Sequence, residues 1–228
     1  MTTLLLSGWT QPTDALAPLA DDAVLFDYSD YASPDAAIEA LRKLKPRHAV
    51  AWSLGGQLAL RAIAAGALAP KHLTVIAAPV QFVSSGSDLE GMGAETYRLF
   101  KESYMHDPAR TKSRFHGLIA KGDGAFKQVM GLLGYHPQVE DIGRWLPWLE
   151  DLAHYRLDMV GLASAPPTLI IHGMNDVIVP HAQSEYLARH LPRAQLNSWA
   201  QVGHAPHAHD AVRLRREMHE HRALQGVA

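Results

Sequence analysis

The sequence predicts an α/β fold built on a mostly parallel, doubly wound β-sheet. Short apolar segments typical of buried strands lie at residues 3–6, 24–26, 48–52, 73–77, 168–172 and 195–199. Helical patterns lie between these segments at residues 34–44, 54–65 and 181–190, and after the last of them at residues 210–219. This alternation is typical of a parallel sheet covered by helices, in which functional sites lie at the carboxyl ends of the strands.

The alternation stops between about residues 84 and 162. This stretch has helical patterns near residues 93–104, 108–119 and 124–133, but no clear strand. We therefore expect a helical cap inserted at 84–162, over a core formed by 1–83 and 163–228.

Composition limits the classes of function. The chain has 228 residues, a formal charge of −2 and no cysteine. The charge gives no overall attraction to nucleic acid or to an anionic membrane, and the lack of cysteine excludes disulfides, thiolate metal sites and a cysteine nucleophile. The apolar run at residues 4–6 is too short for a signal peptide or a membrane span. We expect a cytoplasmic monomer with no nucleic-acid or membrane partner.

Ser53 lies at a junction of strand, turn and helix. The apolar strand at 48–52 leads directly into it, and a helical pattern follows. This arrangement predicts a nucleophile elbow, the sharp turn that presents a catalytic serine in the α/β-hydrolase fold. The turn needs small residues two before and two after the serine, and Ala51 and Gly55 meet that need. The alternative is a serine that only caps the following helix.

Candidates for the acid and the base follow the last two predicted strands. Asp176 lies in the loop beyond residues 168–172, and His204 lies in the loop beyond residues 195–199. Both loops are expected at the same sheet edge as Ser53, and the order Ser, Asp, His is that of the fold. We predict that His204 accepts the Ser53 proton, while Asp176 holds the imidazole tautomer and stabilises the imidazolium.

The histidines at 204, 207 and 209 also allow a metal site. Carboxylates or thiolates at metal-ligand spacing do not accompany them, so we expect no metal and no organic cofactor. His172 lies near Asp176 in the sequence and receives no assigned role.

The oxyanion hole requires two backbone N–H donors aimed at one point. Leu54, directly after the nucleophile, is expected to supply one, and Trp9, after Gly8 and the first strand, the other. Trp9 could also serve as a packing residue. Because the antiparallel hairpin that often precedes this first strand is absent, we expect a sheet trimmed at its N-terminus.

The motifs around these residues resemble the pimeloyl-acyl-carrier-protein methyl ester esterases of biotin synthesis, which are serine esterases of the α/β-hydrolase superfamily. Core segments at 8–9, 52–56 and 204–207 carry the resemblance. The segment at 78–82, which leads into the expected cap, and the segment at 110–115 within the cap, with Gly122 downstream, extend it. The resemblance implies cleavage of the methyl ester of pimeloyl attached to its acyl carrier protein, through an acyl-enzyme.

The same resemblance assigns further roles. Cap arginines of the family meet the acidic carrier protein, and Arg110, Arg114 and Lys127 would do so here, although Gly131 stands at another position that is basic in the family. The alternative is a solvated helix face. Residues expected to line the substrate channel are Gly8, Trp52, Phe82 and Leu132. Such apolar residues could also belong to the core.

Other functions use similar motifs. A general carboxylesterase or lactonase would use the same triad of Ser53, Asp176 and His204 on small esters. A binding protein could retain the fold without catalysis. A C–C bond hydrolase or a cofactor-free haloperoxidase-like enzyme also remains open. A dehalogenase with an aspartate nucleophile is excluded, because the elbow holds Ser53.

Overall fold

Six strands and nine α-helices are found in the residues that the computed structural model describes, 2–84, 86, 89–133 and 142–226. The strands are β1 (Thr3–Leu6), β2 (Ala23–Leu25), β3 (His48–Trp52), β4 (His72–Ile76), β5 (Thr168–Gly173) and β6 (Ala194–Trp199). The helices are α1 (Pro34–Leu41), α2 (Leu54–Ala64), α3 (Ala94–His106), α4 (Pro108–Ile119), α5 (Phe126–Leu133), α6 (Ile142–His154), α7 (Ala182–His190), α8 (Pro206–His209) and α9 (Ala211–Leu224). Two 3₁₀-helices, η1 (Thr13–Leu19) and η2 (Tyr28–Asp30), follow β1 and β2.

The six strands form one sheet in the order β2-β1-β3-β4-β5-β6, and every neighbouring pair is parallel. The predicted α/β class is confirmed, and each strand boundary lies within one residue of its expected place. β1, β3, β4 and β5 are buried along their whole length, as expected where helices cover both faces. The strand order reverses between β1 and β3, which makes the carboxyl ends of these two strands the topological switch point.

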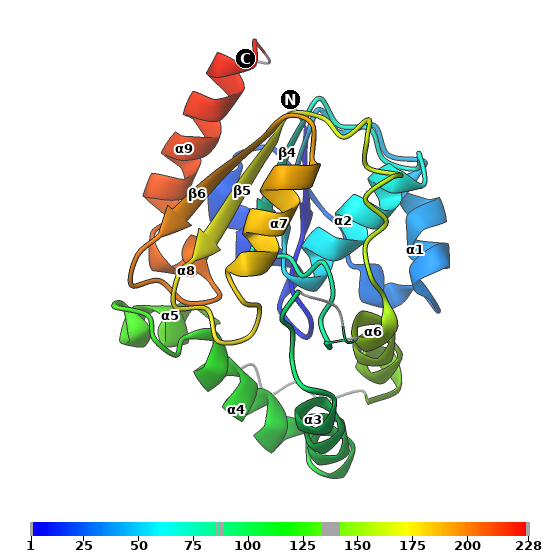
Figure 1. Cartoon of the computed structure of the whole chain (residues 1–228), viewed down its shortest axis with the longest axis vertical. Helices are drawn as coiled ribbons and strands as arrows, with labels where there is room; N and C mark the ends of the chain where they lie inside the picture. Colours follow the sequence, from blue (N-terminus) through cyan, green and yellow to red (C-terminus); the bar gives the residue numbers. More distant parts are fainter. Residues whose placement is uncertain (1, 85, 87–88, 134–141, 227–228) are drawn as a thin grey trace.

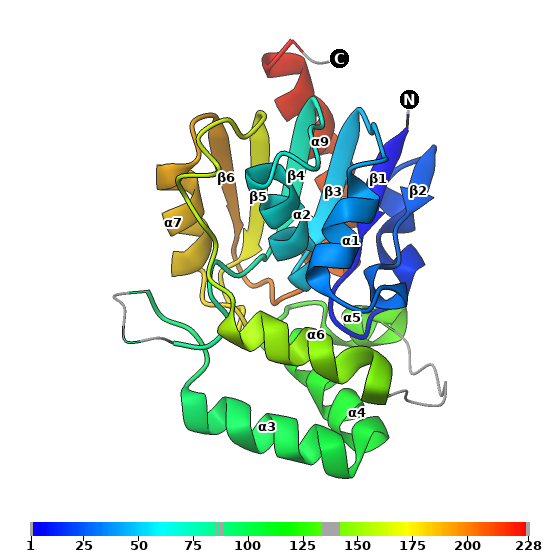
Figure 2. The ribbon, with the colours of Figure 1, turned by 90° about the vertical axis from the view of Figure 1, so that its right-hand side faces the viewer.

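Helices cover the two faces of the sheet. α1 and α2 lie together on one face, and α9 lies on the opposite face (Figures 1 and 2). Nearly all of α2 is buried, because it runs along the centre of the sheet. In the described ranges, no helix is long and apolar enough to cross a membrane.

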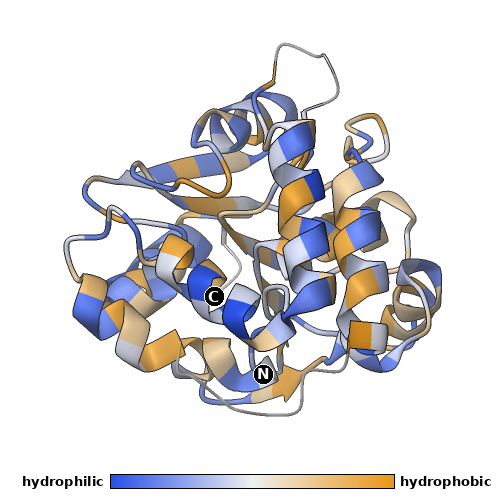
Figure 3. Ribbon diagram, turned by 90° about the horizontal axis from the view of Figure 1, so that it is seen from below, coloured by the Kyte–Doolittle hydropathy of each residue, from blue (hydrophilic) through white to orange (hydrophobic). Residues whose placement is uncertain are grey.

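Helices α3 to α6 lie beyond the carboxyl ends of the strands, whereas both chain termini lie at the other end of the molecule (Figures 1 and 2). Figure 3 views the molecule from the side of α3 to α6 and shows hydrophilic and hydrophobic residues alternating along the helices.

Three of the helices α3 to α6 lie close to their predicted positions, but α6 was not predicted. Its pattern is interrupted by Pro147, which disfavours a helix interior, and burial of Trp148, Leu149 and Leu152 compensates. The division into core and cap stays a prediction.

Two arginines connect α6 to the rest of the chain. Arg61 of α2 forms a largely buried ion pair with Asp151, and its guanidinium lies 3.7 Å from the centre of the Tyr155 ring. Arg144 pairs with Asp27, at 2.6 Å between Nη2 and Oδ2. These contacts attach α6 to α2 and to the loop after β2.

Three buried histidines lie at the amino end of the sheet, opposite the switch point. His48 begins β3, His72 begins β4, and His221 comes from α9. Nε2 of His72 lies 2.5 Å from Nδ1 of His221. Burial, followed by the charge of His221, lowers the pKa of His72 to about 3, and burial with the charge of Arg222 lowers the pKa of His48 to about 4. Both side chains are therefore neutral at pH 7.

The free energy of unfolding is expected to decrease as the pH falls from 6.5, the ordinary histidine pKa, toward about 4. In this window the unfolded chain binds protons that the folded histidines reject, so acid favours unfolding. Nδ1 of His48 is buried without a partner among the described residues, so His48→Leu should preserve stability at pH 7. It should also reduce the loss below pH 6.5.

Urea unfolding at pH 7, 5.5 and 4.5 measures this effect. His219→Gln is the control, because His219 is an exposed histidine of α9. An identical loss of stability in wild type and His48→Leu would contradict the assignment.

Candidate active site

Ser53 occupies a strained turn between β3 and α2. Its φ and ψ angles are 54° and −121°, a region that non-glycine residues rarely adopt. A Cβ atom on Gly55 would lie only 2.4 Å from the carbonyl oxygens of Leu6 and Ser7, so the first turn of α2 sits directly against the end of β1. The Ser53 side chain makes no capping hydrogen bond to α2. The alternative of a helix-capping serine therefore lacks its defining contact.

Backbone strain is concentrated at this edge of the sheet. The non-glycine residues with positive φ in the described ranges are Thr10, Ser53, Ala77 and Gln201. Each follows a strand at its carboxyl end, after β1, β3, β4 and β6 respectively. Such strain persists only where the surrounding structure enforces it, and it is enriched at active sites.

Ser53, Asp176 and His204 meet at the carboxyl edge. Nε2 of His204 lies 2.9 Å from the Ser53 hydroxyl oxygen, and Nδ1 of His204 lies 2.7 Å from Oδ2 of Asp176. Because Nδ1 faces a carboxylate, it carries the proton, and the unprotonated Nε2 can accept a hydrogen bond from Ser53. The His204 and Asp176 side chains are only 1% and 0% exposed. The geometry is that of a nucleophile, a base and an orienting acid.

The Asp176 carboxylate accepts hydrogen bonds from four N–H groups. Oδ1 accepts from the backbone N–H groups of Ile178, at 2.8 Å, and Val179, at 3.0 Å. Oδ2 faces His204 and also Nε2 of His172, at 3.0 Å. Burial alone would raise the pKa of this carboxyl, but the charge of His204 and the hydrogen bonds of both histidines hold it below the ordinary range. Asp176 is therefore ionised.

Trp52, the last residue of β3, contacts the loop that carries His204. Its indole N–H donates to the carbonyl oxygen of His204 at 2.9 Å, and its ring packs edge-on against His207, with 4.3 Å between ring centroids. Burial and then the charge of His204 lower the pKa of His207 to about 3. Trp52 is buried, so its direct contacts position the histidine loop, whereas its predicted place in the substrate channel stays a prediction.

The other histidines of the run 204–209 have separate neighbours. Nδ1 of His209 lies 2.6 Å from Oδ1 of Asp123. Among the residues whose placement is described, no group of three or more His, Asp or Glu side chains could hold a metal ion.

The loop after β1 faces both the elbow and the helices beyond it. A Cβ atom on Gly8 would lie 3.2 Å from the Trp52 ring. The Trp9 side chain is buried, and its indole N–H donates to the carbonyl oxygen of Trp145 at 3.1 Å. Within the described parts of the chain, the backbone N–H groups of Trp9 and Leu54 donate to no protein acceptor. Both are therefore available to a ligand. The rings packed edge-on against Trp9 are those of Phe100, Tyr104 and Phe115.

The turn between α4 and α5 is bonded to the loops of the triad. Asp123, a buried residue of this turn, accepts from the backbone N–H of Gly203 at 3.0 Å. The N–H of His204 itself donates to the carbonyl oxygen of Ile119 at 3.1 Å. Asn175, next to Asp176, donates to the carbonyl oxygen of Gly122 at 2.8 Å. Asp123 is not predicted as a site residue from the sequence, because an aspartate between two glycines is typical of any surface turn.

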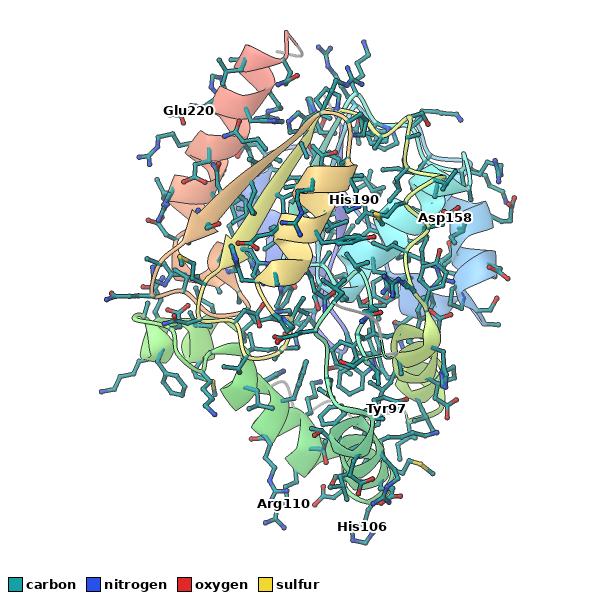
Figure 4. The ribbon with its side chains drawn as sticks, in the orientation of Figure 1. Tyr97, His106, Arg110, Asp158, His190 and Glu220 are labelled. Atoms are coloured by element: carbon teal, nitrogen blue, oxygen red, sulfur yellow. The ribbon has the colours of Figure 1, made fainter. Side chains whose placement is uncertain are left out.

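The remaining predicted residues lie apart from the triad contacts. Phe82 is buried in the segment after β4, whereas Leu132 on α5 is 65% exposed. Arg110 and Arg114 are exposed on α4, and Lys127 is exposed on α5. Figure 4 shows Arg110 pointing away from the sheet into solvent. Their binding roles stay predictions.

Known proteins resemble this chain in sequence. The sequence profile of the "Alpha/beta hydrolase family" matches residues 4–217. A pimeloyl-[acyl-carrier protein] methyl ester esterase from Nitrosomonas europaea is 31% identical over 190 residues, which cover 77% of this chain and 74% of that protein. A protein of the same name from Aromatoleum aromaticum is 31% identical over 172 residues, covering 68% of this chain and 65% of that protein.

Solved structures share the fold. A hydrolase from Oleispira antarctica superposes with a TM-score of 0.79 at 15% identity, covering 99% of this chain and 90% of that one. An esterase from Exiguobacterium antarcticum superposes with a TM-score of 0.73 at 18% identity, covering 100% of this chain and 91% of that one.

Replacing Gly55 by alanine is expected to destabilise the fold by about 3 kcal/mol or more, because the new methyl group would overlap the β1 backbone. Gly117→Ala is the matched control, since a Cβ at Gly117, inside α4, meets nothing within 4 Å. It should be neutral or stabilising by about 0.5–1 kcal/mol. Denaturant unfolding measures both variants, and equal stabilities would contradict the close packing at the elbow.

Proposed function

Because the chain belongs to the alpha/beta hydrolase family, and within it to the family of the pimeloyl-[acyl-carrier protein] methyl ester esterases, we propose that it is a serine esterase acting through Ser53, His204 and Asp176. Its substrate is the methyl ester of a pimeloyl chain carried on acyl carrier protein, and its pathway is biotin synthesis. The observation that supports this reaction is the chain of hydrogen bonds from the Ser53 hydroxyl through His204 to the Asp176 carboxylate.

The mechanism follows from the position of each proton. Nε2 of His204 takes the proton of Ser53 as its oxygen attacks the ester carbonyl carbon. The resulting imidazolium is stabilised by ionised Asp176 and returns the proton to the departing methoxide, so methanol leaves and an acyl-enzyme remains. Water, activated by His204 in the same way, then hydrolyses the acyl-enzyme and releases the free carboxylate and Ser53.

The oxyanion of each tetrahedral intermediate is bound by the N–H groups of Trp9 and Leu54. Both lack a protein acceptor in the described ranges, which supports this role. Leu54 is also the first residue of α2, where the helix dipole adds positive potential. Trp9 is held in place because its buried ring is enclosed by aromatic side chains of α3 and α4.

The carrier protein docks on α4 and α5 through Arg110, Arg114 and Lys127. Arg110 and Arg114 are four residues apart on α4 and therefore share one face of the helix. All three side chains are exposed, and none forms an ion pair with another described residue. Exposed cations without an ion-pair partner in the described ranges fit an acidic partner, although the net charge of the chain is −2. The acyl chain then reaches Ser53 past Gly8, Trp52, Phe82 and Leu132.

Replacing Ser53 by alanine is expected to abolish demethylation of methyl pimeloyl-carrier protein, with a loss of at least about 10⁴-fold, because no other group supplies the nucleophile. Mass spectrometry of the carrier substrate measures the loss of the methyl group. Wild type should also be labelled by a fluorophosphonate probe, and Ser53→Ala should not.

Two results would overturn parts of this proposal. If small esters are cleaved while the carrier substrate stays intact, the chain is a general carboxylesterase or lactonase. If folded wild type neither hydrolyses esters nor reacts with the probe, the catalytic role of Ser53 is wrong.

Charge reversal by Arg114→Glu is expected to lower kcat/KM for the carrier substrate about tenfold or more, because it repels the acidic partner. Activity on p-nitrophenyl acetate should be unchanged. Arg189→Glu provides the same charge change at an exposed position of α7, a helix that lies apart from α4 (Figures 1 and 2). The defect of Arg114→Glu should also diminish with added salt. Equal kcat/KM values for both variants would exclude α4 as the docking surface.

A further inference from the structure

His172 is a fully buried histidine that contacts the triad without belonging to it. It lies in β5, one residue before the end of the strand. Its Nε2 lies 3.0 Å from Oδ2 of Asp176 and 2.9 Å from the carbonyl oxygen of Val179. Its Nδ1 lies 2.6 Å from the hydroxyl oxygen of Ser184 in α7. Each ring nitrogen therefore has a polar partner.

These contacts determine the tautomer of His172. Both partners of Nε2 are oxygen acceptors, so Nε2 carries a hydrogen and shares it between them. In the neutral ring Nδ1 then accepts a hydrogen bond from the Ser184 hydroxyl. Ser184 thus orients His172 as a donor to its Nδ1, whereas Asp176 orients His204 as an acceptor from its Nδ1–H. The hydrogen-bonded line continues from Ser53 through His204, Asp176 and His172 to α7.

We propose that His172 is a positioning residue for the proposed esterase reaction, acting by donating its Nε2–H to the carboxylate oxygen of Asp176 that also serves His204. This inference rests on the catalytic role proposed above for Ser53, Asp176 and His204. The backbone donors of Ile178 and Val179 hold only Oδ1. His172 holds Oδ2, so the carboxylate cannot rotate away when the imidazolium forms.

The shared oxygen also adjusts the strength of the acid–base pair. Oδ2 accepts hydrogen bonds from the N–H groups of both His172 and His204. Sharing the acceptor weakens the electrostatic attraction between Asp176 and the Nδ1–H of His204. Without His172, the carboxylate would interact more strongly with the imidazolium but would be less well oriented. Turnover should therefore fall while protonated His204 becomes more stable.

Other titratable groups lie beside His172. The ring centroid of His181, at the start of α7, is 5.5 Å from that of His172. Nδ1 of His181 lies 3.4 Å from a carboxylate oxygen of Glu185 on the same helix. Neither His181 nor Glu185 forms a hydrogen bond with Asp176 in the described contacts, so changes at these residues separate a general charge effect from the specific hydrogen bond.

Three variants test the inference. His172→Leu removes the donor, His172→Gln retains an N–H donor at a similar distance from the backbone, and His181→Gln is the matched control. Hydrolysis of p-nitrophenyl acetate is followed from pH 5 to 9, giving kcat and KM separately. Urea unfolding of each variant gives the fraction folded under the assay conditions.

His172→Leu is expected to lower kcat about 10- to 100-fold, the range found for outer hydrogen-bond partners of metal-bound histidines, with little change in KM. The acidic limb of the pH–rate profile should move to higher pH, because protonated His204 is stabilised. His172→Gln should restore most of kcat and the wild-type limb. His181→Gln should match wild type in both respects.

An NMR titration of ¹⁵N-labelled histidines separates this inference from the proposed function. The His204 ring should take up its proton at a higher pH in His172→Leu than in wild type, and this readout requires no turnover. If it does so in a protein that neither cleaves esters nor reacts with a fluorophosphonate, the coupling stands and the esterase proposal fails. If His204 titrates identically in wild type and His172→Leu, the inference is overturned. The same holds if the acidic limb does not move and activity falls only in proportion to the folded fraction.

Discussion

A buried carboxylate can remain charged only where donors replace the water it has lost, and the arrangement of the site depends on this requirement at Asp176. Its side chain is fully buried, yet four N–H groups point at it. They come from β5, from the loop that carries Asp176 and from the loop after β6. These hydrogen bonds fix the loop after β6 against the loop that carries Asp176. They thereby direct Nε2 of His204 toward Ser53.

Close approach of backbone segments is the second constraint at this edge. A Cβ atom on Gly173 would lie 2.1 Å from the carbonyl oxygen of Gly203, and one on Gly203 would lie 2.9 Å from that of Ile119. Three segments, from β5, from the loop after β6 and from the end of α4, are therefore layered without side chains between them. Because of this layering, the end of α4 and the loops that carry Asp176 and His204 form one packed unit. A partner that binds α4 acts on a helix whose far end touches the backbone of His204.

The histidines illustrate how environment decides chemistry. His204 is paired with a carboxylate and can serve as a base, whereas burial keeps His207 neutral only three residues later. His72 contacts His221 at the opposite end of the sheet, and burial lowers its pKa so that it is neutral at pH 7. These differences arise from neighbours that are distant in the sequence, so residue type and local pattern do not distinguish them.

Local patterns in the chain predict every strand to within one residue and place Ser53, Asp176 and His204 after strands, because strand burial and turn chemistry depend on adjacent residues. That these three side chains share one edge follows from parallel strands, which the alternation of elements predicts. Helix α6 and the contacts of His172 and Asp123 become apparent only in the folded chain. Pro147 locally disfavours α6. Each of these depends on packing or hydrogen bonds to other elements. A sequence pattern records which residues are apolar, small or polar, whereas the partner of a buried polar group is decided only when the chain brings distant segments together.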